Sequence, residues 1–84
     1  MPDAPFVPIP VPDAGRLPGG AVPAVAGWLA EVGDRVRGGD PVAELTAPGV
    51  LFDAVSLADG VLVRVNVAAG GRVRPDEPLG WVER

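Results

Sequence analysis

Residues 32–45 read V-G-D-R-V-R-G-G-D-P-V-A-E-L, and residues 69–82 read A-G-G-R-V-R-P-D-E-P-L-G-W-V. A shift of 37 residues without a gap places Gly33 on Gly70 and Pro41 on Pro78, and it also aligns the two R-V-R segments. Each copy is typical of a short strand, a turn rich in Gly, Pro and acidic residues, and a second strand. Two copies are too few for a solenoid, so they predict one all-β domain of pseudo-twofold symmetry with two packed sheets.

A longer apolar segment precedes each copy, at residues 22–32 and 61–67. We expect both to be strands, the first with a bulge or bend because Pro23 and Gly27 interrupt its alternation. A helix in residues 22–32 is the alternative, because Trp28, Leu29 and Val32 have helical spacing, and Pro23 and Gly27 argue against it.

The N-terminal part of the chain is rich in proline. We expect residues 1–6 to form a loose terminus before a single domain over residues 7–84. Residues 6–11 read F-V-P-I-P-V, in which Pro8 and Pro10 point the same way and cannot donate to a ladder. This segment can therefore only be an edge strand.

The joint between the two halves is L-T-A-P-G-V-L at residues 45–51. Pro48 presets a negative φ and Gly49 tolerates a positive one, which predicts the tight turn of a β-hairpin. We expect Gly33 and Gly70 to adopt special backbone angles before the R-V-R strands, and Asp34 to start a turn by bonding nearby N–H groups.

Composition excludes several classes of function. The 84 residues carry a net charge of −4, from seven Arg against eleven acids, with no Lys, His, Cys or Tyr. An acidic chain without a basic patch is a poor nucleic-acid binder. No apolar run approaches the length of a membrane span, and the start of the chain lacks a basic signal-peptide region, so we expect a cytoplasmic protein that binds no membrane.

The sequence contains few residues that could act in catalysis or bind a metal. The hydroxyls are Thr46 and Ser56, and no His, Lys or Cys exists to activate them, so we expect no catalytic residue. Asp76 and Glu77 are adjacent acids of a solvated turn, with a weak Ca²⁺ site as the alternative. The absence of His and Cys excludes zinc-type sites, and we expect no metal.

Three segments carry a resemblance to a known family. Residues 27–45, 58–65 and 70–79 resemble the biotinyl/lipoyl attachment domains, and residues 11–15 (V-P-D-A-G) together with Trp28 resemble the lipoyl domains of 2-oxo acid dehydrogenase acyltransferases. Thr46-Ala47 resembles the biotin type equally well. The resemblance implies a flattened barrel of two four-stranded antiparallel sheets, the barrel-sandwich hybrid.

The family's function depends on a lysine at the hairpin tip, to which lipoate or biotin is joined by an amide. An ungapped count places that lysine on Gly49, flanked by Pro48 and Val50. Arg cannot replace it, because the guanidinium stays protonated. We therefore expect no cofactor and no enzyme activity. A Gly49→Lys variant should fold if φ at this position is negative.

The resemblance and the missing lysine together predict a binding or structural module. Its partner would be a component of a dehydrogenase-type or carboxylase-type complex, or a second copy of the chain. The alternatives are a barrel-sandwich segment of a transport or membrane-fusion adaptor, and a carrier whose prosthetic group is attached in an unrecognised way. Trp81 is expected either to pack on Arg72 or Arg74, or to mark a contact surface.

Overall fold

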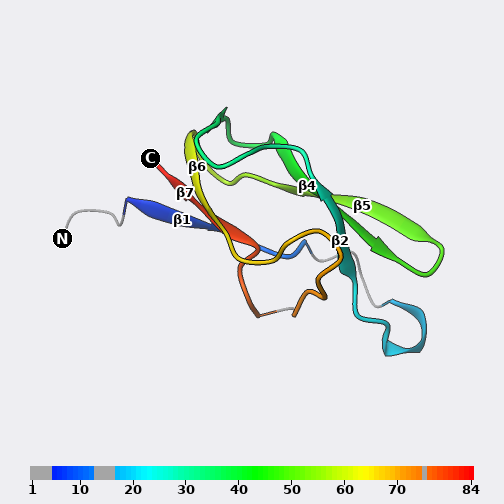
Figure 1. Ribbon diagram of the computed structural model, residues 1–84. Helices are drawn as coiled ribbons and strands as arrows, with labels where there is room; N and C mark the ends of the chain where they lie inside the picture. Colours follow the sequence, from blue (N-terminus) through cyan, green and yellow to red (C-terminus); the bar gives the residue numbers. More distant parts are fainter. Residues whose placement is uncertain (1–4, 13–16, 75) are drawn as a thin grey trace.

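The computed structural model describes residues 5–12, 17–74 and 76–84, and these residues form strands with one short 3-10 helix (Figure 1). The elements in chain order are β1 (Phe6–Ile9), η1 (Pro18–Gly20), β2 (Ala24–Trp28), β3 (Arg35–Val36), β4 (Pro41–Ala47), β5 (Val50–Val55), β6 (Gly60–Val65) and β7 (Gly80–Glu83). In the part of the chain described, no helix is long enough to cross a membrane.

The strands form two antiparallel sheets. Sheet A has the order β1-β7-β6-β3, and sheet B has the order β2-β4-β5. The fourth position of sheet B is marked by a single bridge between Ala24 and Arg72. The all-β barrel-sandwich prediction is confirmed, with one sheet of four strands and one of three rather than two of four.

Pro23 explains why the fourth strand of sheet B is reduced to a bridge. In sheet A, β3 pairs Val36 with Gly60. The equivalent pair in sheet B is Val73 with Pro23, and the N–H of Val73 donates to the oxygen of Pro23 at 2.9 Å. Proline has no N–H to return the second bond, so the ladder cannot continue there.

The repeat in the sequence is a repeat of hydrogen-bond register. In the β2–β4 pair, Val25 lies opposite Leu45, with a bulge between Val25 and Gly27. In the β6–β7 pair, Leu62 lies opposite Val82, with a bulge at the same place, one residue after Leu62. The predicted irregularity of the first strand is therefore a bulge, and the alternative of a helix is excluded.

Hydrogen bonds between the halves follow the same symmetry. The N–H of Gly33 donates to Leu62 at 2.7 Å, and that of Gly70 donates to Val25 at 2.8 Å. Gly33 has a φ of 101° and Gly70 a φ of 88°, as predicted. Asp34 does bond the backbone, although it accepts from the N–H of Glu31, three residues earlier, so it closes a turn rather than starting one.

The core lies between the two sheets and draws equally on both halves. Four pairs of equivalent residues are buried in it: Val25 with Leu62, Val36 with Val73, Val42 with Leu79, and Leu45 with Val82. The other buried members are Ile9, Ala43 and Ala54. Burial of these alternating residues is the main favourable term that holds the sheets together.

The N-terminal segment is an edge strand, as the prolines predicted. β1 pairs with β7 alone and begins at Phe6, one residue before the expected start of the domain. Of the V-P-D-A-G segment, residues 13–15 lie outside the described part of the chain, as do residues 1–4 of the expected loose terminus.

Candidate functional site

The candidate site is the turn between β4 and β5. Ala47 pairs with Val50, so Pro48 and Gly49 are the whole connection. Gly49 has a φ of 77°, and the proline ring keeps φ of Pro48 negative, which together give a type II turn. The two-residue hairpin predicted from the sequence is confirmed.

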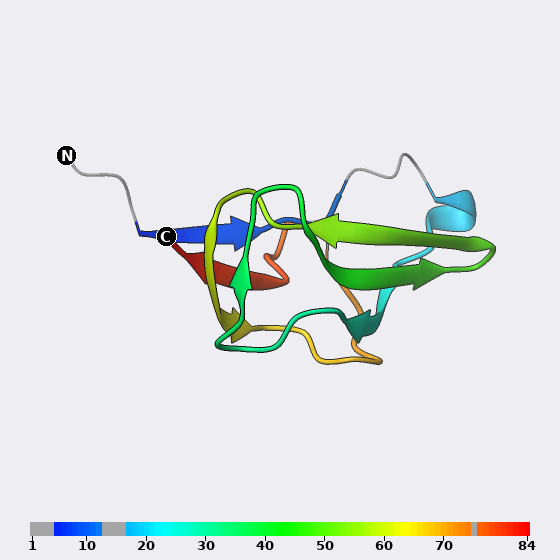
Figure 2. The same ribbon diagram turned by 90° about the horizontal axis from the view of Figure 1, so that it is seen from above.

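This turn projects from the end of the molecule. β4 and β5 extend together as a narrow arm, and the turn lies far from the C-terminus and from the start of β1 (Figure 2). Pro48 and Gly49 are exposed, and a Cβ built on Gly49 would have no heavy atom within 4 Å. Space therefore does not limit a side chain at this position, but the positive φ does, because L residues other than Gly, Asn and Asp rarely adopt it.

A shallow hollow of about 470 Å³ lies beside the turn. Its walls are mostly small and apolar, with one arginine, and comprise Ala21, Val22, Ala24, Thr46, Ala47, Pro48 and Arg72. The hollow is open to solvent and brings Arg72 near the tip, a proximity that depends on the Ala24–Arg72 bridge and was not predicted.

The two hydroxyl groups offer no nucleophile. Ser56 is 1% exposed, and its Oγ donates to the carbonyl of Ala58 at 2.7 Å, in the turn that follows β5. Thr46 is half-buried on β4, and the chain contains no His, Lys or Cys to take its proton. Neither residue is arranged for covalent catalysis.

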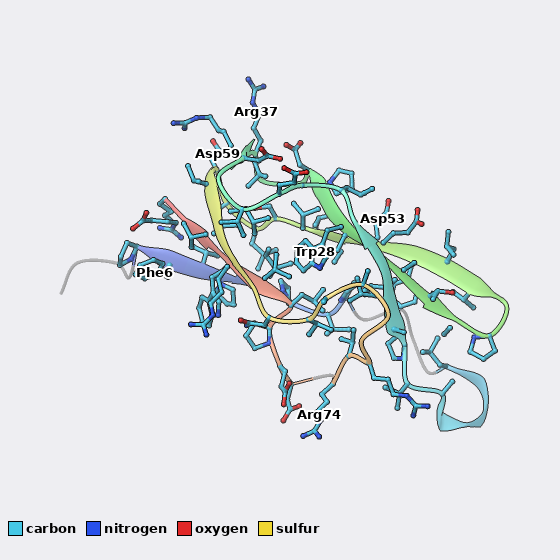
Figure 3. The ribbon with its side chains drawn as sticks, in the orientation of Figure 1. Phe6, Trp28, Arg37, Asp53, Asp59 and Arg74 are labelled. Atoms are coloured by element: carbon cyan, nitrogen blue, oxygen red, sulfur yellow. The ribbon has the colours of Figure 1, made fainter. Side chains whose placement is uncertain are left out.

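The two tryptophans have different roles. Trp28 points into the interior, packs against the core and donates from Nε1 to the carbonyl of Val67 at 2.8 Å (Figure 3). Trp81 is half-buried on sheet A, where its neighbours across the ladders are Pro8 and Arg64. The expected partners Arg72 and Arg74 are therefore not its neighbours in the sheet, because strand pairing brings β1 and β6 to its sides.

Asp76 and Glu77 are the adjacent acids for which a Ca²⁺ site was the alternative. Asp76 and Glu77 are exposed, and Glu77 lies 3.6 Å from the guanidinium of Arg74 in an exposed ion pair. Among the described residues, no group of three or more acids could hold a cation. This arrangement is that of a solvated turn.

The family-model comparison agrees with this geometry. A family model described as "Biotin-requiring enzyme", the biotin/lipoyl model, matches residues 7–82. The chain belongs to the biotinyl/lipoyl attachment domain family. Domains of this family are carrier modules that interact with partner enzymes and are not catalytic themselves. A search of curated proteins gave no match.

The residues at the turn do not fit the prosthetic group of the family. An amide link needs a side-chain amine, whereas the turn offers the ring of Pro48 and the bare Cα of Gly49, and Val50 already belongs to the ladder. No lysine occurs anywhere in the 84 residues. That Gly49 takes the place of the attachment lysine stays a prediction from the ungapped count.

Proposed function

We propose that this chain is a lipoyl-like domain without a lipoylation or biotinylation site, and that it acts as a non-catalytic binding or structural module. Its partner in this proposal is a component of a 2-oxo acid dehydrogenase-type or carboxylase-type complex. The observation that carries the proposal is the Pro48-Gly49 turn, in a family scaffold that keeps both antiparallel sheets.

The turn argues against attachment in two ways. It lacks an amine, and its backbone is set by residues that a lysine could not replace without strain, since Gly49 has a φ of 77°. The two hydroxyls of the chain are poor substitutes, because Ser56 is buried at the far end of β5 and the chain has no His, Lys or Cys to act as a base for Thr46. A carrier with an unrecognised attachment is therefore less well supported than a module that carries nothing.

The transport-adaptor alternative is also less well supported. Such domains carry inserted arms at this tip, whereas Ala47 and Val50 here pair directly across a two-residue turn. There is no room for an insertion between β4 and β5.

Intact-mass spectrometry tests the proposal. The chain is coexpressed with a lipoate ligase and a biotin ligase, and we expect the unmodified mass. A lipoyl or biotinyl increment on the wild-type chain would overturn the proposal, and an increment of another kind on Thr46 or Ser56 would revive the alternative carrier.

A matched variant makes the unmodified mass informative. The triple substitution Pro48→Asp, Gly49→Lys, Val50→Ala installs the Asp-Lys-Ala sequence of lipoyl domains, and without proline the turn can adopt type I angles with negative φ. We expect this variant to be modified. Its modification would show that the ligases recognise the scaffold, so the wild-type result reports the missing amine.

A further inference from the structure

The outer edge of β5 has no partner strand in the described part of the chain, where β5 pairs with β4 alone. Two backbone hydrogen bonds at the end of β5 fix which backbone groups face that edge. The N–H of Ser56 donates to Asp40 at 2.9 Å, and the N–H of Gly39 donates to Ser56 at 2.7 Å. Because direction alternates along a strand, the N–H and C=O groups of Leu51, Asp53 and Val55 face away from β4.

β1 is the equivalent edge of sheet A, and it is closed by proline. The carbonyls of Pro5 and Ile9 accept from Arg84 and Leu79 of the β7 side, so Pro8 and Pro10 face the open edge. Neither has an N–H, which leaves the N–H of Phe6 as the one donor that β1 offers along this edge, and an edge depleted of donors is a poor template for another strand.

The two edges can be compared position by position. Asp53 pairs with Glu44 as Pro8 pairs with Trp81, and the 37-residue shift places Glu44 on Trp81. Asp53 in β5 is therefore equivalent to Pro8 in β1. Two residues further along each strand, Val55 is equivalent to Pro10. Of the two edges compared, proline therefore removes two donors from that of β1, whereas that of β5 keeps all of its donors.

The side chains along this edge define what could bind. Leu51 is 64% exposed and Val55 is 36% exposed, and Asp53 lies between them, standing clear of the sheet (Figure 3). Asp53 is directly opposite Glu44, which places two carboxylates side by side on the outer face. Neither is in an ion pair within the described residues, and like charges in direct opposition destabilise a sheet.

A second copy of the chain is a poor occupant for this edge. The antiparallel register that uses all three edge residues would oppose Leu51 with Val55, and it would also oppose Asp53 with Asp53, beside two Glu44 side chains. A basic residue opposite Asp53 would instead offset both carboxylates, in a chain whose net charge is already −4.

We propose that the edge of β5 binds an extended peptide segment of another protein, in which a Lys or Arg is flanked two residues away on each side by aliphatic residues. The segment adds a strand to sheet B, with its aliphatic side chains on Leu51 and Val55 and its basic side chain on Asp53. Main-chain hydrogen bonds supply affinity and the alternate side chains supply selectivity. This deepens the binding role proposed above, but it does not depend on the turn.

A titration followed by NMR tests this proposal. The probe is the capped heptapeptide T-V-T-R-T-V-T, added to the ¹⁵N-labelled chain. We expect slower amide hydrogen exchange at Leu51, Asp53 and Val55, and we expect the peptide with Glu in place of Arg to bind about ten-fold more weakly, since it returns a like charge to Asp53. Perturbation confined to other strands, or equal binding of the two peptides, would overturn the proposal.

Two variants separate charge from hydrogen bonding. Asp53→Asn keeps the N–H and should lower the preference for the Arg peptide, whereas Asp53→Pro removes the donor and should abolish binding. Asp53→Pro copies Pro8 and should fold. If Asp53→Pro does not fold, Val55→Pro, which copies Pro10, tests whether the edge donors are needed. A peptide N-methylated at the amides that face β5, added to the wild-type chain, tests the same requirement from the other side.

Sedimentation of the chain without peptide provides the remaining control. We expect a monomer, and a dimer that Asp53→Pro dissociates would assign the edge to a second copy and overturn the proposal. The result is independent of the intact-mass experiment, because one reads the edge of β5 and the other reads the turn.

Discussion

The two halves of this domain share a backbone frame and differ in the side chains placed on it. Trp28 on β2 and Val65 on β6 occupy equivalent positions, and their ladder partners Ala43 and Gly80 are equivalent as well. The large residue Trp28 belongs to the first half, and its ring packs beside Gly80, the smallest possible residue, in the second half. The comparison shows that the two halves share their hydrogen-bond register, while large and small side chains are placed differently in each half so that together they fill one core.

Trp28 gives the largest expected effect. We expect Trp28→Ala to lower the free energy of unfolding by about 3–5 kcal/mol, because it leaves a core cavity and removes the donor to the Val67 carbonyl. Urea denaturation measures this. Trp81→Ala is the matched control and should cost about 1–2 kcal/mol, since that ring is half-buried on the outer side of sheet A and leaves no cavity in the core. Equal costs would contradict the placement of Trp28 in the interior and of Trp81 on the outer face of sheet A.

Gly80 is expected to be next in size. A Cβ there would meet the carbonyl oxygen of Arg64 and the Trp28 ring, the latter at 3.2 Å. We expect Gly80→Ala to cost about 2–3 kcal/mol by overpacking, measured by urea denaturation.

The equivalent position provides the control for that variant. Ala43 is fully buried and already has a Cβ, so Ala43→Gly should cost only about 1 kcal/mol, mainly from chain entropy. If Gly80→Ala were neutral, the ring of Trp28 would not fill the space above Gly80.

Gly49 gives the smallest expected effect. Gly49→Ala should cost about 1 kcal/mol, because its φ is 77° and a Cβ would strain the backbone without meeting any neighbour. Thermal unfolding measures the loss. Gly49→Asn is the control and should cost less, since Asn tolerates this conformation. A neutral Gly49→Ala would mean that the turn adopts negative φ in solution.

The sequence predicted what depends on local chemistry. The repeat located the two halves, Pro48-Gly49 located the hairpin, and Pro8 and Pro10 identified an edge strand before its partner was known. In each case the geometry follows from the residue itself or its nearest neighbours.

Features that depend on distant pairing were not predicted. The neighbours of Trp81 and the reduced fourth strand of sheet B both require knowing which strands lie side by side. The open edge of β5 left a signal in V-L-F-D-A-V, six residues without proline or glycine, but its meaning becomes clear only beside β1. The sign of φ at Gly49 was left conditional, and its value of 77° makes a single Gly49→Lys variant strained.

The symmetry of register has one more consequence, for chain connectivity. The N–H of Arg84 donates to the carbonyl of Pro5 at 2.8 Å, and the 37-residue shift makes this pair the counterpart of Ala47 and Val50, which close the hairpin. A two-residue link between Arg84 and Pro5 would complete a second hairpin, and a cut between Pro48 and Gly49 would open the first. Such a circular permutant would retain every strand pair of the domain, with its termini placed at the present turn between β4 and β5.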